Sequence, residues 1–282
     1  MLKLFKMDVY RMAKSKATWL CIAGTILMVM FSVFMTSSDV HYYIDHPDEL
    51  KKIERNQEEG EGWGIYIGSV MPSWCKGEKV PYVNLVENNI QSKMVLLFFV
   101  VFVVGFVNSE NKCRFVQNIS GQISNRGKII LSKIFISTLF TVIQMLSVMF
   151  FIGIASAMLF GYINMEHLKG IFLFMGIEML LQAAFGTFII LVITVTKSTI
   201  GSMVIGILLS SGIAQVFDPL CKAVFHVSKS FSIMFYTLTG NIGQMNTLSD
   251  GYHYRKAFII AVTMLVAAGY ISAKIMQKRD VE

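Results

Sequence analysis

The sequence predicts an all-α, polytopic membrane protein: a single transmembrane domain of six membrane-spanning helices preceded by an interfacial helix. Two observations support this fold class. The 282-residue chain is 54% hydrophobic and only 15% charged, which is too apolar for a water-facing surface. The hydrophobic residues also form continuous runs, several of which reach the roughly 20 residues that a helix needs to cross about 30 Å of hydrocarbon. The short alternating segments typical of a β-barrel are missing from the sequence.

Residues 1–16 predict an amphipathic helix that lies on the membrane surface. Leu2, Phe5, Val9 and Met12 recur at helical spacing and share one face, whereas the lysines of this stretch point elsewhere. A helix with one apolar and one basic face lies in the interfacial plane of a bilayer. We therefore expect membrane lipid to be a direct partner of this helix.

Six apolar runs follow, and each predicts one transmembrane helix. The second run is short, so we expect its helix to extend over 88–108, into the polar residues at both ends. The connector 218–256 is semi-apolar and could re-enter the membrane where packed helices shelter its backbone. The predicted spans cover residues 17–36, 94–107, 134–159, 170–195, 199–217 and 257–273.

The distribution of basic residues predicts the orientation, because lysine and arginine near span ends are retained on the cytoplasmic side. With both termini in the cytoplasm, 14 of the 25 basic residues fall in short inner segments. Residues 37–92 then form an extracytoplasmic segment, whose ten acidic and five basic residues give a net charge of −5. The inner segments are 1–16, 108–133, 196–199 and 274–282.

Several kinds of chemistry are not supported by the sequence. The segment GQISNRGKI at 121–129 superficially resembles a nucleotide-binding P-loop, but five residues rather than four separate its glycines, and Ile129 follows Lys128. We therefore expect the chain to bind no ATP. Its cysteines and histidines show no metal-ligand spacing, and its spans hold no paired catalytic groups, so no metal, cofactor or enzymatic activity is expected. The net charge of +7 is explained by topology rather than by nucleic acid.

The segment between the second and third predicted spans is the strongest candidate for contact with another protein. Residues 109–126 alternate polar groups with regularly spaced apolar ones, which predicts a cytoplasmic helix that could dock a partner. An alternative is that the basic residues only enforce topology and attract anionic lipid headgroups. The candidate docking residues of this segment and its continuation are Glu110, Arg114, Gln122, Asn125, Arg126, Lys128 and Lys133.

This segment resembles that of permease subunits in the type-2 exporter family of ATP-binding-cassette (ABC) transporters. The matching residues are Glu110, then Ser124 with Arg126, and finally Lys133 at the start of the third span. The span layout of nearly the whole chain is also similar to that family. Within it, bacitracin-type and bacteriocin self-protection permeases are the most similar, although Arg114 and Phe115 replace the Gly-Thr often found after the glutamate.

The resemblance implies a half-transporter in a bacterial cytoplasmic membrane. Two permeases, identical or different, would pair, and each would place its coupling helix in a cleft of a separate cassette ATPase subunit. ATP and magnesium would bind to those ATPases and not to this chain. The expected function is outward transport of an amphipathic or hydrophobic molecule, for example an antimicrobial peptide.

Three polar residues within the spans are candidates for a translocation path. Glu178 and Gln182 share one face of the fourth predicted span, and Gln144 lies in the third. A charged side chain at such depth should face a cavity or a partner rather than lipid. Interhelical hydrogen bonding is the alternative role.

Small residues at four-residue spacing predict close contacts between helices, either within the chain or across a dimer. These residues are Gly153, Ala157 and Gly161, in and just after the third span, and Ser202, Gly206 and Ser210 in the fifth. Cys75 and Cys221 fall on the predicted outer side and could form a disulfide.

Two other classes of function remain open on the sequence. The chain could be an ATP-independent sensor or immunity protein that binds a ligand through its outer segment. It could also be a proton-driven secondary transporter with Glu178 as the carrier, although inverted repeats are not evident.

Overall fold

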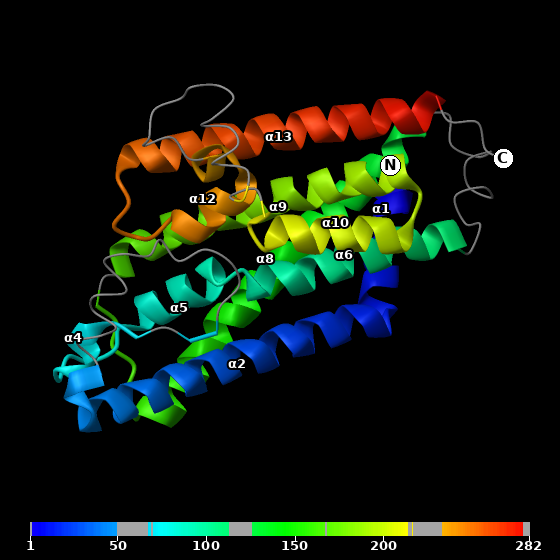
Figure 1. The fold of residues 1–282 in the computed structure, drawn as a ribbon. Coiled ribbons are helices and arrows are strands. Elements are labelled where there is room, and N and C mark those ends of the chain that lie inside the picture. The colour runs from blue at the N-terminus through cyan, green and yellow to red at the C-terminus, as the bar shows by residue number, and fades with distance from the viewer. Residues whose placement is uncertain are drawn as a thin grey trace.

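Long helices lying side by side make up the protein in a computed structural model (Figure 1). The structure describes residues 2–49, 67–68, 70–112, 126–166, 168–213, 216 and 233–278. Within these residues the one β contact is an isolated bridge between Pro81 and Asn164. Helix α1 (Leu2–Lys14) and the last turns of α13 (Gly251–Lys278) lie at one end of the bundle, which we call the terminal end; the other is the loop end.

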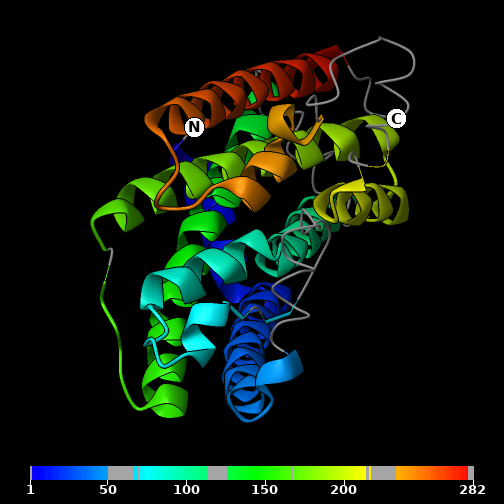
Figure 2. The same cartoon turned by 60° about the vertical axis from the view of Figure 1, so that its left-hand side comes forward.

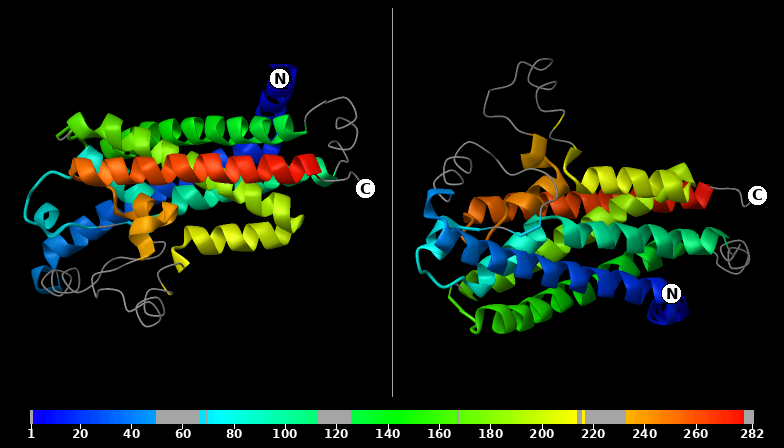
Figure 3. Two further views of the ribbon diagram at one scale, coloured as in Figure 1. Left: turned by 90° about the horizontal axis from the view of Figure 1, so that it is seen from above. Right: turned by 60° about the horizontal axis from the view of Figure 1, so that its bottom comes forward.

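The N-terminal segment folds as two helices that meet at Ser15. Extended backbone at this residue (φ −74°, ψ 122°) separates α1 from α2 (Lys16–Asp45), and α1 crosses the terminal end of the bundle (Figure 3). Helix α2 contains the predicted span 17–36 and continues for nine residues beyond it. A helix satisfies its own backbone hydrogen bonds, so it need not end where apolar residues end.

The second predicted span, 94–107, lies within one helix, but the helix predicted to extend over 88–108 is interrupted. Helix α5 (Tyr82–Gln91) meets α6 (Met94–Lys112) at an angle of 50°. The bend falls at Lys93, whose φ of 62° is left-handed and incompatible with a straight α-helix. The prediction of one helix through 88–108 was therefore wrong. A short helix, α4 (Pro72–Cys75), precedes the pair at the loop end.

Helices α8 (Gly127–Phe160) and α9 (Ile171–Thr196) form the predicted hairpin of the third and fourth spans. Helix α8 begins seven residues before the predicted start at 134 and ends at Gly161, which caps it with φ 72°. A single 3₁₀ turn, η1 (Leu168–Gly170), leads into α9. Helix α9 packs against α6, α8, α10, α12 and α13, so it is the centre of the bundle.

The fifth predicted span is only partly helical. Helix α10 (Thr199–Ser210) has 12 residues and a length of about 18 Å, which is shorter than the roughly 30 Å of hydrocarbon. Beyond it, η3 (Ile233–Tyr236) and α12 (Leu238–Gln244) turn back against the bundle, and α12 lies between α5 and α13 (Figure 2). This part of the connector therefore packs on the helices rather than extending away from them.

Four helices of the described chain are long and apolar enough to cross a membrane, and the number becomes five if the bent α5–α6 pair is counted as one span. The four are α2, α8, α9 and α13. This architecture is the one expected of a multi-pass membrane protein. Large apolar side chains such as Leu27, Phe150, Phe172 and Ile259 are exposed along these helices, as a lipid-facing surface requires.

Candidate functional site

The candidate docking segment is described only at its two ends. Arg114, Gln122, Ser124 and Asn125 lie outside the described residues, as does most of the predicted coupling helix 109–126. Glu110 falls within the last turn of α6. On the far side, Arg126 immediately precedes α8, and Lys128 and Lys133 occupy its first two turns. The structure therefore places the two flanks of the segment at the terminal end of the bundle (Figure 1).

Lys133 is engaged inside the bundle rather than displayed to a partner. Its Nζ lies 3.1 Å from Oδ2 of Asp8 on α1, and the two side chains are 3% and 0% exposed. The hydroxyl of Ser132 donates to the same carboxylate oxygen. The Lys133 ammonium is therefore inaccessible to another protein in this conformation, and the predicted part of Lys133 in ATPase coupling stays a prediction.

Arg11, which pairs with the same carboxylate, connects α1 to α6. Arg11 lies 3.3 Å from Oδ1 of Asp8 and donates a 3.2 Å hydrogen bond to Oγ of Ser109. The ring of Phe106 is shared by two cations: the Arg11 guanidinium carbon lies 5.1 Å and Lys133 Nζ 5.2 Å from its centroid. Asp8, Arg11, Phe106, Ser109, Ser132 and Lys133 form what we call the α1 anchor. It joins α1 to the two helices that flank the docking segment.

The α1 anchor forms because the predicted apolar face of α1 does contact the bundle. Met12 is 5% exposed, and the ring of Phe5 packs against Phe135 of α8 with centroids 5.1 Å apart. Asp8 lies between these residues on α1, so packing that face carries its carboxylate into the interior. A buried carboxylate is costly unless it is paired and hydrogen-bonded, which the surrounding cations and hydroxyl provide.

Two of the three predicted path residues meet in a buried hydrogen-bond chain. Gln182 Nε2 donates to Gln144 Oε1 over 2.9 Å, and Gln144 Nε2 donates to Thr25 Oγ1 and to the carbonyl of Val95 at 2.9 and 3.0 Å. These groups come from α2, α6, α8 and α9, and Gln144 is 0% exposed. Sequence reasoning missed Thr25, because a single threonine in an apolar run carries no pattern.

Glu178 lies one turn from Gln182 on α9 and is 0% exposed. Neither of its carboxylate oxygens has a hydrogen-bond partner, and Oε1 of Gln182 is also unsatisfied. These three oxygens are buried polar atoms in the centre of the bundle that no protein group engages, although most buried polar atoms are hydrogen-bonded.

Of the two predicted sets of small residues, only the set in α10 packs closely against another helix of the chain. Ser202, Gly206 and Ser210 are buried along one face of α10, where a Cβ on Gly206 would lie 2.6 Å from Val100. In α8, by contrast, Ala157 and Gly161 are exposed, and a Cβ on Gly153 would come no closer than 3.8 Å to Tyr82. Contact of that second set with another chain stays a prediction.

Lys93 is a buried cation that sequence reasoning did not single out. Its side chain is 2% exposed. A Cβ atom added at Gly212 would lie 3.0 Å from the Nζ atom of Lys93, and a Cβ atom added at Gly243 would lie 3.4 Å from the same Nζ atom. The ammonium therefore lies beside the C-terminal ends of α10 and α12. Helix C-termini carry partial negative charge, which accounts for a lysine at this depth.

The predicted disulfide involves one described and one undescribed residue. Burial raises the pKa of the Cys75 thiol, whereas Cys221 lies outside the described residues, so the pairing stays a prediction. The part of the chain that the structure describes contains no group of three metal-ligating side chains.

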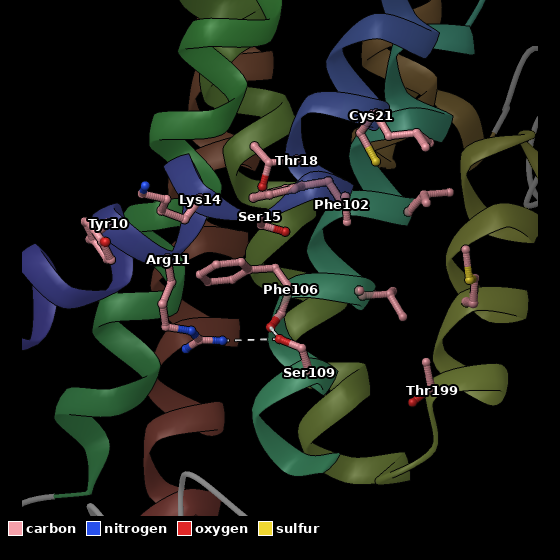
Figure 4. A pocket seen from close by; sticks show the side chains of 16 residues that line it. Tyr10, Arg11, Lys14, Ser15, Thr18, Cys21, Phe102, Phe106, Ser109 and Thr199 are labelled. Atoms are coloured by element: carbon pink, nitrogen blue, oxygen red, sulfur yellow. Dashed lines mark hydrogen bonds between the residues drawn. The ribbon is translucent and has the colours of Figure 1, made fainter. Parts of the chain in front are cut away.

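A groove of about 540 Å³ lies at the terminal end between the α1–α2 junction, α6 and α10 (Figure 4). Apolar side chains make most of its walls, and Tyr10, Arg11 and Lys14 line one side. The Arg11–Ser109 hydrogen bond of the α1 anchor borders it (Figure 4).

Comparison with known proteins does not assign this chain to a family. No protein-family model matches the sequence, and neither does any curated protein.

Proposed function

We propose that this chain is the permease subunit of an ATP-driven exporter of the ABC type in a bacterial cytoplasmic membrane. The observation that supports this proposal best is the α1 anchor. Asp8 pairs with Lys133 on α8, and Arg11 bonds to Ser109 on α6, so both helices that flank the predicted docking segment are joined to α1. Because α1 leads directly into α2, a displacement of the segment would be transmitted to three helices at once.

In this proposal the energy comes from a partner. Two cassette ATPase subunits bind ATP and magnesium, and each receives the coupling helix 109–126 of one of two paired permeases. Closure of the ATPases moves the coupling helices, and the spans change from an inward-open to an outward-open arrangement. The chain has six spans, of which the fifth begins with α10; both termini are cytoplasmic, and 37–92 is extracytoplasmic.

The substrate class proposed is an amphipathic or hydrophobic molecule, such as an antimicrobial peptide. The acidic segment 37–92 would attract a cationic peptide from outside. Inside the bundle, the Thr25–Gln144–Gln182 chain and the unsatisfied Glu178 supply polar groups at the depth where a transported molecule would pass.

The test is co-purification with candidate cassette ATPases, comparing wild type with Arg126→Glu. Arg126 immediately precedes α8, and a glutamate at a helix N-terminus is favourable, so this change should leave the fold intact. The matched control is Lys274→Glu, which alters an exposed cation on α13 at the same end. A complex lost only in Arg126→Glu supports the proposal. Association with no candidate ATPase would overturn it and favour an ATP-independent sensor or immunity protein.

A second candidate is a proton-driven secondary transporter, and Glu178 is the observation that favours it. A fully buried carboxyl group without hydrogen-bond partners is suited to exchanging a proton during transport. In reconstituted vesicles, substrate movement driven by a pH gradient without ATP, and abolished by Glu178→Gln, would support this mechanism over the ATP-driven one.

A further inference from the structure

The groove at the terminal end combines apolar walls with nearby positive charge. Leu20 and Cys21 of α2, Val101 and Phe102 of α6 and Met203 of α10 line it over the first turns of α2. A Cβ added to Gly105, which also lines the groove, would meet no atom within 4 Å. The groove therefore has room beside α6 for an extended apolar chain.

Exposed lysines make α1 and its junction with α2 basic, and one of them, Lys14, lines the groove. Lys3, Lys6, Lys14 and Lys16 are all exposed, whereas the one acidic residue of this stretch, Asp8, is 0% exposed and paired in the α1 anchor. The surface that a headgroup would approach is therefore positive. Lys14 itself lines the groove, with its Nζ 5.9 Å from the centroid of the Tyr10 ring.

Hydroxyl groups lie between the charged rim and the apolar walls. Ser15, Ser109 and Thr199 line the groove together with Thr18 (Figure 4). Thr18 is 3% exposed, and its Oγ1 has no hydrogen-bond partner. The Thr18 hydroxyl is therefore a hydrogen-bonding group on this wall of the groove that no protein group engages.

We propose that this groove binds one anionic phospholipid from the leaflet at the terminal end. The headgroup phosphate lies beside Lys14, ester oxygens reach Thr18, and one acyl chain extends along α6 past Gly105. This order of charged, polar and apolar groups matches that of a phospholipid along its length. The site does not depend on the proposed transport function, because it requires only the α1–α2 junction, α6 and α10.

The experiment uses the full-length protein reconstituted with equal amounts of phosphatidylglycerol and phosphatidylcholine. Native mass spectrometry then measures the lipid that each variant retains. Lys14→Ala should lower the preference for phosphatidylglycerol about fivefold, the factor expected for one basic residue near an anionic headgroup. Lys6→Ala, on the same helix but not lining the groove, is the matched control and should leave the preference unchanged.

The second pair of variants tests the acyl-chain path. Gly105→Leu fills the groove and should abolish retention of the bound lipid. Gly176→Leu is the control, because Gly176 is an exposed glycine of α9 where an added Cβ also meets no atom within 4 Å. Size-exclusion profiles establish that each variant is folded. The lipid preference of the wild-type protein tests the proposal even without a variant.

Three results would overturn the proposal. Equal retention of phosphatidylglycerol and phosphatidylcholine by the wild-type protein would mean that the retained lipid is only the non-specific annular lipid around the helices. Equal losses in Gly105→Leu and Gly176→Leu would show that the groove is not the site. A disulfide-linked dimer formed by Gly105→Cys in membranes, and not by wild type, would show that a second copy of the chain covers the groove instead.

Discussion

Removing the carboxylate at the centre of the α1 anchor should destabilise the protein strongly. Asp8→Ala leaves Lys133 and Ser132 without their shared acceptor in a site where Asp8 is 0% and Lys133 3% exposed. Breaking a buried ion pair on one side costs about 3–5 kcal/mol, whereas an exposed pair would cost under about 1 kcal/mol. A loss of about 3 kcal/mol lowers the ratio of folded to unfolded protein more than about 100-fold.

The measurement is unfolding by sodium dodecyl sulfate in mixed micelles, followed by tryptophan fluorescence. Asp45→Ala, which removes an exposed carboxylate at the other end of α2, should change the free energy of unfolding by less than about 0.5 kcal/mol. The double variant Asp8→Leu with Lys133→Leu removes both charges, so it should be less destabilised than the sum of its single variants by about 1–3 kcal/mol. Additive effects, or a loss in Asp8→Ala no larger than in Asp45→Ala, would refute the buried pair.

Three further variants test the interior of the bundle. Gln144→Leu removes the hydrogen bonds that join α2, α8 and α9 and should lower the free energy of unfolding by about 1–3 kcal/mol in the same unfolding assay. Glu178→Gln keeps the shape of the side chain and should leave folding intact while reducing transport in vesicles; unchanged transport would exclude a role in the path. Gly186→Ala places a methyl group against Ser137 and Phe99 and should lower the free energy of unfolding by about 1–3 kcal/mol, whereas Gly176→Ala, with open space around it, should not.

Hydropathy predicted the long helices well because apolar runs report where a chain contacts lipid. It placed α2, α8, α9 and α13, although α2 continues as a helix for nine residues beyond the predicted span 17–36. The bend at Lys93 was missed for a different reason. A left-handed residue between two helical segments depends on how α5 and α6 pack, and lysine gives no local signal for it.

The candidate sites were predictable only in part. Gln144 and Gln182 were recognisable because amides are rare in apolar spans, and the structure joins them by a hydrogen bond. Asp8 was not singled out, since one acidic residue in a basic amphipathic helix has no distinctive pattern. Its partner Lys133 lies 125 residues away, so only the fold reveals the pair.

That separation in sequence has a consequence for how the protein is made. Synthesis at roughly 5–20 residues per second requires about 6–25 s to add the 125 residues between Asp8 and Lys133. During this interval α1 has emerged from the ribosome, but the lysine that neutralises its carboxylate does not yet exist. The pairing of α1 with α8 is therefore a late event of biogenesis, because it must follow the synthesis of Lys133.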